Sequence, residues 1–420
     1  NNASDLFQYK TDSLVGKAGI EKVYEKSLRG SKGYRTIEVD VHGAPVRVLE
    51  VDPPLKAEDI TLSLDGSLQR VARESMLGKS GAVIAMDPRT GLIKALVSFP
   101  DYDPAIFNKR KINLLKQIIK DKKSPLFNRA VSGNYPPAST IKPFLGIYGL
   151  NKKAINWKTE INDEGTFQVN EGGRIFKGWK EEGHGLVNLS KAIIESSDVY
   201  FYNLALKLKI KDIANFLKSM GFGKRTGIDL DNEQTGVVPD SKWKLGNIGN
   251  SWYAGDTINL GIGQGYLTST PIQLAVATSA LANKGVTFKP RIVQKIGNKL
   301  TNQELLYKIS TKEINWKNME NSLLSVIESW NGTAHNIFVS GEYRIAGKTG
   351  TAQTSSLLAE EEYSIVRKES SRRDHALFIG YGPVPNPKLV IVVVVEYGES
   401  GSAVAAPIAK KLFDTYLSKI

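Results

Sequence analysis

Apolar runs separated by turn residues predict five strands in this chain, two near residue 90 and three near the C-terminal end. The first two runs flank Pro88-Arg89-Thr90-Gly91, which is a strong hairpin signal with an apolar face. The last run ends in a Gly/Ser turn, and the amphipathic segment Ala405 to Leu417 that follows predicts a helix. The predicted strands are Gly81 to Asp87, Leu92 to Ser98, Tyr343 to Gly350, His375 to Gly382 and Lys388 to Gly398.

These strands predict an α+β fold. Their short turns favour antiparallel pairing, so we expect a five-stranded antiparallel sheet built from both ends of a domain and flanked by helices. Between the second and third strands lies a long region that is helical and rich in loops. The polar stretch Ser355 to Asp374 predicts a mobile loop beside the strand that precedes it.

The N-terminal part of the chain has a different character. Residues 1–60 are polar and punctuated by glycines, and the stretch ends at VDPPLKAED, where Pro53-Pro54 indicates a linker. We therefore expect two parts: a small, truncated N-terminal module over 1–60 that acts as a pedestal or dimerisation unit, and one large domain over 61–420.

Composition excludes several classes of protein. With 420 residues, of which 41% are hydrophobic and 24% charged, the chain is long enough for a large globular domain and is not a disordered protein. It has no cysteine, so disulfides, thiolate nucleophiles and cysteine metal clusters are excluded. The longest aliphatic run, Leu389 to Val395, is too short to span a bilayer, and the sequence opens without an initiator Met. We expect any signal or anchor to have been removed.

The net charge is +13 and the isoelectric point is near 9.4, which predicts attraction to anionic surfaces such as acidic lipids or wall polymers. The densest basic stretch, Asn108 to Lys123, carries isoleucines and a leucine at helical spacing, so we expect a solvated helix with one buried stripe. The sequence contains no recognised nucleic-acid-binding signature, and we expect no nucleic acid as a partner.

Three short motifs carry candidate chemistry: STIK at Ser139 to Lys142, SSD at Ser196 to Asp198, and KTGT at Lys348 to Thr351. The SxxK spacing on a helix sets a hydroxyl and an amine on one face, one turn apart, so the lysine can accept the serine's proton. Tyr135-Pro136-Pro137 precedes the first motif and an apolar run follows it, which predicts a Pro-rich turn leading into a helix N-terminus.

Other matches to these short patterns are weaker. A second SxxK occurs at Ser241 to Lys244, in a Gly- and Asn-rich segment that we interpret as a surface loop with no helix after it. Ser196 and Asp198 precede a helical stretch, so their hydroxyl and carboxylate can act as caps of that helix while also facing a cleft. The GKT at Gly347 to Thr349 lacks the glycine spacing of a phosphate-binding loop, and we exclude nucleotide binding.

Taken in order, these motifs make the chain resemble the class B penicillin-binding proteins, and among them the members that act in cell elongation. The handful of segments that carry the resemblance spans nearly the whole sequence, and SxxK, a second serine motif and KTG are its established signature. The segments are YPPASTIKP (Tyr135 to Pro143), GHG (Gly183 to Gly185), ESSDVYFYNLA (Glu195 to Ala205), GDTINLGIGQGYLTSTPIQLA (Gly255 to Ala275), GKTGTAQ (Gly347 to Gln353) and GSAVAAPIA (Gly401 to Ala409).

The resemblance implies a serine D,D-transpeptidase that crosslinks peptidoglycan stem peptides ending in D-Ala-D-Ala. Ser139 would be the nucleophile and Lys142, held neutral by burial and a nearby cation, its base. Ser196 would pass a proton to the leaving amine, and Asp198 would order the second motif. Lys348 would act in the same network. Backbone N–H groups of Ser139 and Thr351 would form an oxyanion hole.

The substrate-binding residues that the resemblance implies belong to the KTGT segment, where a cation flanked by hydroxyl donors suits the terminal carboxylate of the substrate. They are Lys348, Thr349, Gly350, Thr351 and Gln353. The resemblance also implies covalent inhibition by β-lactams, a periplasmic location, an N-terminal membrane anchor that this chain lacks, and a RodA-type glycosyltransferase and MreC-type scaffold as partners.

We expect no cofactor and no bound metal. Some relatives carry a zinc site near the second motif, but here Ser197 is the middle residue of SSD and Gly178 stands where an acidic ligand would be expected. His184 and Asp163 alone are too few ligands for a closed zinc site. His184 is therefore expected to be a hydrogen-bonded structural residue of the GHG turn, and His375 to be structural as well.

Four rival functions remain open at this point. A β-lactamase or a D,D-carboxypeptidase shares the three motifs but releases the acyl group to water, and a β-lactam sensor is acylated without being an enzyme. A basic polymer-binding module would leave the ordered motifs unexplained.

Overall fold

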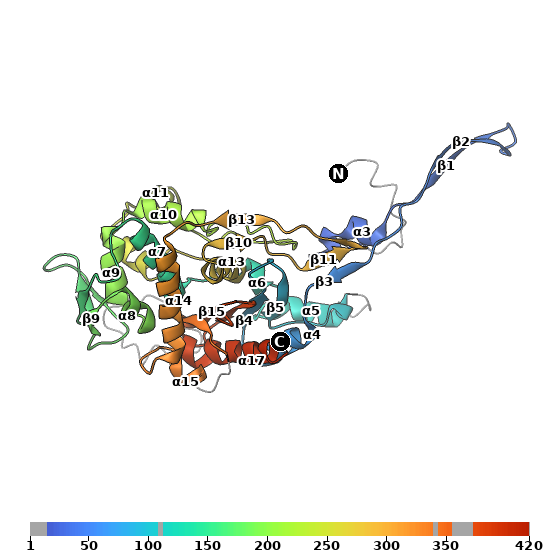
Figure 1. The fold of residues 1–420 in the computed structure, drawn as a ribbon. Coiled ribbons are helices and arrows are strands. Elements are labelled where there is room, and N and C mark those ends of the chain that lie inside the picture. The colour runs from blue at the N-terminus through green and yellow to red at the C-terminus, as the bar shows by residue number, and fades with distance from the viewer. Residues whose placement is uncertain (1–14, 108–111, 339–342, 355–372, 420) are drawn as a thin grey trace.

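The computed structural model describes residues 15–107, 112–338, 343–354 and 373–419 (Figure 1). At its centre lies one antiparallel sheet of five strands in the order β14-β15-β16-β4-β5. The strands are β4 (Gly81–Met86), β5 (Ile93–Phe99), β14 (Ala346–Ala352), β15 (His375–Gly382) and β16 (Leu389–Val395). This confirms the predicted sheet and its construction from both ends of the domain, because β16 pairs with β4.

The central strands of this sheet are buried on both faces, which explains their unbroken apolar sequences. All seven residues of β16, LVIVVVV, are buried, and so are all six of β4. A strand covered on both faces has no polar side to alternate with, so the period of two is lost. The length and β-branched composition of the run, rather than its alternation, therefore made β16 recognisable.

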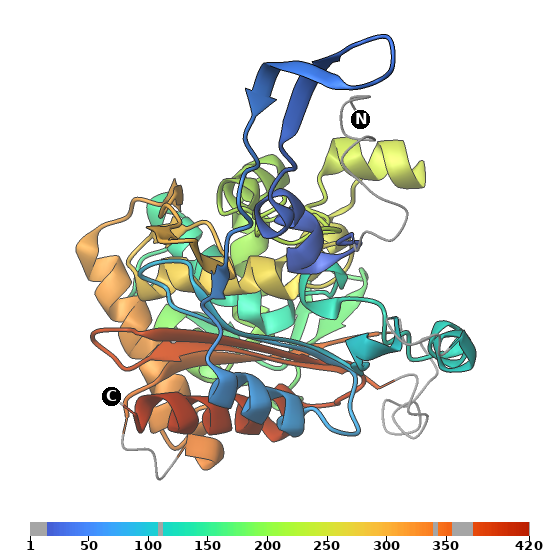
Figure 2. The same ribbon diagram turned by 90° about the vertical axis from the view of Figure 1, so that its right-hand side faces the viewer.

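Helices cover both faces of the sheet in layers (Figure 2). Two helices that contact each other, α4 (Gly66–Ser75) and α17 (Ala406–Leu417), lie on one face, and α13 (Pro271–Ala282) lies on the other against β4, β15 and β16. The helix predicted at Ala405 to Leu417 is thus present as α17, entered through a short π-helical turn at Gly401–Ala405. Next to β14, the longest helix, α14 (Glu313–Glu328), packs alongside.

The region between β5 and β14 is helical and rich in loops, as expected, and it also contains short strands. Its further helices are α5 (Ile112–Lys120), α6 (Arg129–Ser132), α7 (Lys142–Asn151), α8 (Leu189–Ile194), α9 (Asp198–Lys207), α10 (Ile210–Ser219), α11 (Ser241–Ile248), α12 (Ala254–Gly261) and α15 (His335–Phe338). Its short strands are β6 (Ile161–Asp163), β7 (Thr166–Gln168), β8 (Ile175–Lys177), β9 (Gly185–Val187), β10 (Val286–Phe288), β11 (Val293–Ile296), β12 (Lys299–Leu300) and β13 (Leu305–Lys308).

The loop predicted around Ser241 is wrong, because this segment forms helix α11. The side chain of Asp240 accepts a hydrogen bond from the backbone N–H of Trp243 and so caps the helix, which ends at Gly249 in the left-handed conformation. Lys244 is buried and its Nζ lies 2.6 Å from Asp256 Oδ2. The lysine of the second SxxK match, Lys244, therefore forms an ion pair on α11, a helix that carries neither of the other two motifs.

The buried stripe predicted for the basic segment is also wrong. Helix α5 has no buried residue; Leu115 and Ile118 are half-buried, while Ile112 and Ile119 are 61% and 63% exposed. Residues 108–111 of that segment lie outside the described residues, as does the predicted loop at Ser355 to Asp374 apart from its last two residues.

Residues 34–52 form an extended two-stranded ribbon that projects away from the rest of the molecule (Figure 1). Two short helices, α2 (Gly19–Val23) and α3 (Glu25–Arg29), precede the paired strands β1 (Tyr34–Val39) and β2 (Pro45–Asp52), whose side chains are almost all exposed. Strand β3 (Ile60–Leu62) instead pairs with β11 of the main body. Among the helices described, none combines the length and the apolar character that crossing a membrane would take.

Candidate active site

The first motif begins in a tight turn and continues into a helix. Ser139 lies in a 3-10 turn, Ala138–Ile141, and Lys142 is the first residue of α7. Ala138 has a φ of +48°, which is unfavourable for a residue with a side chain, and its N–H donates to the Gly263 carbonyl at 2.9 Å. The turn leaves Ser139 half-buried while Lys142 is fully buried. The nucleophile candidate is thus accessible and the base candidate is shielded from water.

The second motif occupies the sharp bend between α8 and α9. Ser196 has a φ of +60°, and Ser197 is the N-cap of α9, accepting a hydrogen bond from the Tyr200 N–H at 3.2 Å. The sequence-based expectation that Ser196 and Asp198 cap this helix is therefore wrong. Because the middle serine takes the capping role, the side chains of Ser196 and Asp198 are free to contact Lys142.

Lys142 joins the first two motifs directly. Its Nζ donates to the Ser196 carbonyl at 2.8 Å, to Ser196 Oγ at 3.2 Å and to Asp198 Oδ1 at 2.7 Å. Three acceptors around one nitrogen satisfy all three protons of an ammonium group. These acceptors favour the charged form of Lys142 and so oppose the effect of its burial, which lowers the pKa of the amine.

The third motif places a second buried lysine beside the first. Lys348 is fully buried on β14, and its Nζ donates to the Thr349 carbonyl at 3.1 Å. Burial, reinforced by the positive charge of Lys142, holds the pKa of Lys348 well below its ordinary value. Burial also lowers the pKa of Lys142, although the Asp198 carboxylate opposes that shift. The effect of a neighbouring cation, expected for Lys142, thus falls on Lys348.

Strand β14 lies at the edge of the sheet and presses directly against the serine turn. A Cβ added to Gly350 would lie 2.9 Å from Thr140 Cγ2, so glycine permits this close approach. Thr349 Oγ1 lies 2.8 Å from Thr333 Oγ1, and the Thr351 carbonyl accepts from Gln264 Nε2 at 3.1 Å. The strand carrying KTGT is therefore held beside the serine turn by contacts with Thr333 and with Gln264.

The structure brings most of the candidate residues together. Lys142, Ser196 and Asp198 are in direct contact, and the pKa of Lys348 responds to the charges of both Lys142 and Asp198. Thr349 and Thr351 follow on the same strand, whereas Gln353 is exposed beyond the end of β14. The site is thus built from the start of α7, the start of α9 and the edge strand of the sheet.

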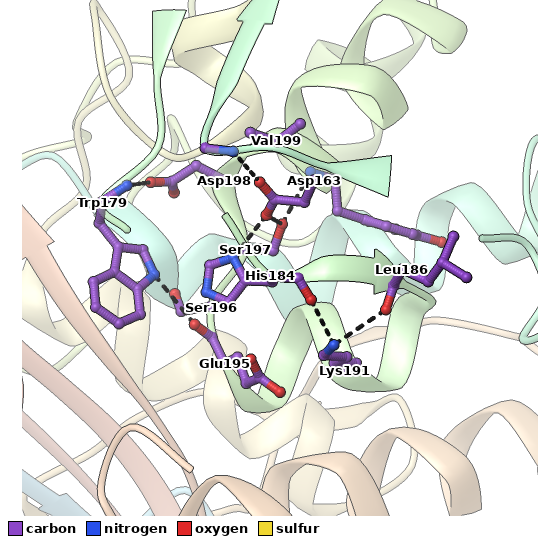
Figure 3. Close-up of polar contacts among 12 residues, drawn as sticks. Asp163, Trp179, His184, Leu186, Lys191, Glu195, Ser196, Ser197, Asp198 and Val199 are labelled. Carbon is purple, nitrogen blue, oxygen red and sulfur yellow. Dashed lines mark hydrogen bonds and ion pairs between the residues drawn. The ribbon is translucent and has the colours of Figure 1, made fainter. Parts of the chain in front are cut away.

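Sequence reasoning missed several residues that position this site. Trp179 donates from its backbone N–H to Asp198 Oδ2 at 3.1 Å and from its ring to the Glu195 carbonyl at 3.2 Å (Figure 3). Gln264 was part of a quoted segment, but no role was assigned to it. Its position between Gly263 and Gly265 is a sequence signal for a close approach between chain segments, and Gly263 indeed has a φ of +74°.

The two histidines considered earlier both have hydrogen-bond partners. His184 Nδ1 lies 2.7 Å from Asp163 Oδ2 (Figure 3). His375 Nδ1 accepts from the Tyr397 N–H at 3.1 Å, and its ring meets that of Tyr135 edge to face. Burial lowers the pKa of His375. Both side chains therefore have structural contacts of the kind expected.

The residues near His184 do not suit a metal ion. Asp163 already accepts from Ser197 Oγ at 2.6 Å and from the Gly165 N–H at 2.9 Å, in addition to its contact with His184. A serine hydroxyl is not among the usual zinc ligands, and Gly178 supplies no side chain. Throughout the described ranges, no group of three or more histidine, cysteine, aspartate or glutamate residues could hold a metal.

Comparisons with known proteins agree with this geometry. Residues 81–414 match the family model of the penicillin binding protein transpeptidase domain, and residues 1–62 match that of the penicillin-binding protein dimerisation domain. The chain is 39% identical over 417 residues to a peptidoglycan D,D-transpeptidase, MrdA, of Haemophilus influenzae. That alignment covers 98% of this chain but only 64% of the relative's length.

Solved structures give the same picture. One is Pseudomonas aeruginosa PBP2 in complex with WCK 5153, with a TM-score of 0.82 and 35% identity, covering 96% of this chain and 84% of that one. Another is the complex between PBP2 and MreC from Helicobacter pylori. Its TM-score is also 0.82, with 32% identity, and the match covers 96% of this chain and 73% of that one.

Proposed function

Because this chain belongs to the penicillin-binding protein transpeptidase family, we propose that it is a serine D,D-transpeptidase that crosslinks peptidoglycan stem peptides. The observation that carries the proposal is the buried Lys142, which contacts Ser196 and Asp198 while it follows Ser139 by one helical turn. A lysine in this position can take a proton from one serine and exchange it with the other.

In the first half-reaction, Ser139 Oγ attacks the carbonyl carbon of the penultimate D-Ala, and neutral Lys142 takes the hydroxyl proton. The C–N bond to the terminal D-Ala then breaks, and the proton passes through Ser196 Oγ to the leaving amine. Burial supports this step because it lowers the pKa of Lys142. The products are an acyl-serine ester and free D-Ala, and Lys142 is neutral again.

Two further groups would bind and polarise the substrate. The backbone N–H groups of Ser139 and Thr351 would donate to the developing oxyanion, as expected where β14 approaches the serine turn. The hydroxyls of Thr349 and Thr351, together with the positive charge of Lys348, would hold the substrate's terminal carboxylate. Gly350 leaves the strand backbone open to this close approach, and Gln353 would contact the substrate further along the strand.

In the second half-reaction, the amine of another stem peptide attacks the ester carbonyl. The bond to Ser139 breaks, and one amine proton returns through Ser196 and Lys142 to the serine oxygen. Water as the acceptor would instead give a carboxypeptidase or a β-lactamase, and a stable acyl-serine alone would serve a sensor. The similarity to MrdA of Haemophilus influenzae over 98% of this chain favours the transpeptidase.

The cellular setting is proposed on the same similarity. The protein would act in the periplasm during cell elongation, held to the inner membrane by an N-terminal anchor. An MreC-type scaffold is proposed as a partner because the Helicobacter pylori PBP2 in the similar structure is complexed with MreC. A RodA-type glycosyltransferase is proposed as a second partner from the family resemblance, and covalent inhibition by β-lactams follows from the chemistry of Ser139. No cofactor enters the mechanism.

The test is intact-mass analysis and peptide mapping after incubation with a penicillin. We expect a long-lived adduct on Ser139 that Ser139→Ala abolishes and that Ser241→Ala, at the second SxxK serine, leaves unchanged. Incubation with D-Ala-D-Ala stem peptides should then yield crosslinked dimers. Drug hydrolysis without a lasting adduct would favour a β-lactamase, and acylation without any crosslinking or D-Ala release would favour a sensor.

A further inference from the structure

Behind the second motif lies a hydrogen-bonded cluster of three buried side chains, Asp163, His184 and Ser197 (Figure 3). Asp163 Oδ2 accepts from His184 Nδ1 at 2.7 Å and from Ser197 Oγ at 2.6 Å. Its other oxygen accepts from the Gly165 N–H at 2.9 Å. The carboxylate is 2% exposed, so these three donors replace the water that burial removes.

The sequence builds this cluster from two short strands and a glycine turn. Asp163 ends β6 and His184 immediately precedes β9, and these strands pair with each other. Gly183 has a φ of +72°, and a Cβ there would lie 2.1 Å from the Asp163 carbonyl oxygen. Only glycine can therefore let the His184 turn close over Asp163.

Ser197 connects this cluster to the chemistry. It lies between Ser196 and Asp198, it is fully buried, and one hydroxyl both donates to Asp163 and caps α9. Its neighbour Ser196 has a φ of +60°, a conformation that is unfavourable for a residue with a side chain. Such a bend persists only where surrounding contacts over-determine it. The hydrogen bonds of Ser197 are contacts of that kind.

Helix α8, which leads into the second motif, is tied to the same turn. Lys191 Nζ donates to the His184 carbonyl at 2.6 Å and to the Leu186 carbonyl at 3.1 Å (Figure 3). The Trp179 ring lies 5.6 Å from the His184 ring, and its backbone N–H reaches Asp198. The β6–β9 segment (residues 161–187) therefore contacts the second motif and the residue before it at three points. Trp179 reaches Glu195 and Asp198, and Asp163 reaches Ser197.

We propose that Asp163, His184 and Ser197 form a metal-free clamp of positioning residues that holds Ser196 and Asp198 in the geometry Lys142 requires. The inference rests on the proposed function, since it concerns how the acylation machinery is held in place. The clamp would do by hydrogen bonding what a metal would otherwise do at this place, since neither the donor set nor its occupied oxygens suit zinc.

The clamp works only if the carboxylate stays ionised and the ring donates through Nδ1. Burial alone would raise the pKa of Asp163, but the hydrogen bonds from Ser197, Gly165 and His184 hold it below its ordinary value. His184 Nε2, in contrast, is buried without a hydrogen-bond partner in the part of the chain that is described. The ring therefore contributes through Nδ1 only. A substitution that keeps or removes this one donor tests its role directly.

The test uses two substitutions at His184 that differ in that one donor. The amide nitrogen of His184→Asn can occupy the place of Nδ1 and still donate to Asp163, whereas His184→Leu removes the donor. Acylation by a penicillin is followed by stopped-flow, which separates the binding constant from the acylation rate constant. The control is Asn162→Ala, because Asn162 is exposed and lies next to Asp163 on β6.

We expect His184→Leu to lower the acylation rate constant on the order of 100-fold, the loss typical of a misplaced catalytic group, with little change in binding. His184→Asn and Asn162→Ala should acylate within about threefold of the wild type, well below that loss. Treatment of the wild type with a chelator should change nothing. The inference is overturned if the Leu variant acylates normally, if Asn fails as Leu does, or if the chelator abolishes acylation.

Ser197→Ala guards against a variant that does not fold. It removes only one hydroxyl, so we expect a folded protein by thermal melting, normal penicillin binding and slow acylation. Normal acylation in a folded Ser197→Ala protein would also overturn the clamp. If the wild type itself forms no adduct, the proposed function fails; if it acylates and the variants equal it, only the clamp fails.

Discussion

At the residue scale, the charge state of Lys142 sets how the proposed acylation depends on pH. Acylation needs the neutral amine, so its rate should rise with pH through a pKa that burial lowers from 10.5. The Asp198 carboxylate opposes that shift, so Asp198→Asn should move the rise in rate to lower pH. Rate constants for penicillin acylation measured across pH test this. A midpoint that stays in place or moves upward would contradict the role of Asp198.

At Lys348 we expect stability and activity to conflict, because the buried amine lowers the free energy of unfolding while the proposed chemistry requires it. Its pKa is depressed in the folded state, so between that pKa and 10.5 the unfolded chain binds more protons, and stability rises with pH. Lys348→Met should therefore raise the free energy of unfolding by about 1–3 kcal/mol at pH 7, the cost of a poorly satisfied buried polar group. The gain should shrink above pH 10.5, where the amine is neutral in both the folded and the unfolded state, while acylation is lost at every pH.

Thermal melting at pH 7 and at higher pH, together with acylation rates, tests this second prediction. Lys299→Met on the exposed strand β12 is the matched control and should change neither quantity. A Lys348→Met protein that melts at a lower temperature than the wild type at pH 7 would show that the buried cation is compensated.

The candidate residues could be selected from the sequence because SxxK, SSD and KTGT are short motifs with fixed spacing, and their chemical roles stay predictions. Their hydrogen bonds were not predictable. Which serine of SSD caps α9 depends on the backbone bend at Ser196, and no local pattern encodes that bend. The contact between Asp163 and Ser197 joins residues 34 positions apart and depends on how β6 packs beside α9.

At the scale of elements, the end of α12 holds the serine turn through a glycine contact. A Cβ at Gly263, where φ is +74°, would lie 2.3 Å from the Ala138 carbonyl oxygen. Gly263→Ala should therefore shift the turn, destabilise the protein by at least about 1–2 kcal/mol and slow acylation. Gly246→Ala in α11 meets no atom within 4 Å and should be neutral or stabilising.

Urea unfolding and acylation rates of both glycine variants check this contact. If Gly263→Ala acylates at the wild-type rate, the turn tolerates movement that the geometry argues against. If Gly246→Ala is equally damaging, the loss reflects a general sensitivity to alanine rather than the contact with Ala138.

Some elements were predictable and others were not, for physical reasons. The five sheet strands were found because long apolar runs between turn residues have few other interpretations. Helix α11 was missed because glycine and asparagine outweighed its capping residue Asp240. The three-residue strands of the β6–β9 segment are too short for any periodicity, and the exposed α5 depends on packing that its own pattern does not specify.

At the scale of the whole molecule, the β1–β2 ribbon should be separable from the site. Ser31 and Leu55 exchange backbone hydrogen bonds at 3.0 Å, so the two ends of the ribbon are already close together. Replacing residues 34–52 with a short Gly/Ser linker should leave the melting temperature and the acylation rate unchanged. Extending the deletion through β3 should lower the melting temperature, because β3 pairs with β11 of the main body.

The exposed side chains of the β1–β2 ribbon suggest a role in contacts with other chains. Its strands expose several valines to solvent, among them Val46 at 61% and Val51 at 58%. Exposed paired strands of this kind are prone to pair with other chains. If the ribbon-free variant were less active or less stable than the full chain, the ribbon would have to act on the main body rather than outside it.

The pairing of β16 with β4 has a consequence for the timing of biosynthesis. The chain is made from its N-terminus, and β4 waits for a partner strand that is made some three hundred residues later, at Leu389–Val395. Contacts this distant in sequence form slowly. The proposed acylation of Ser139 therefore has to wait until β14, β15 and β16 have been made and have paired, because Lys348 lies on β14.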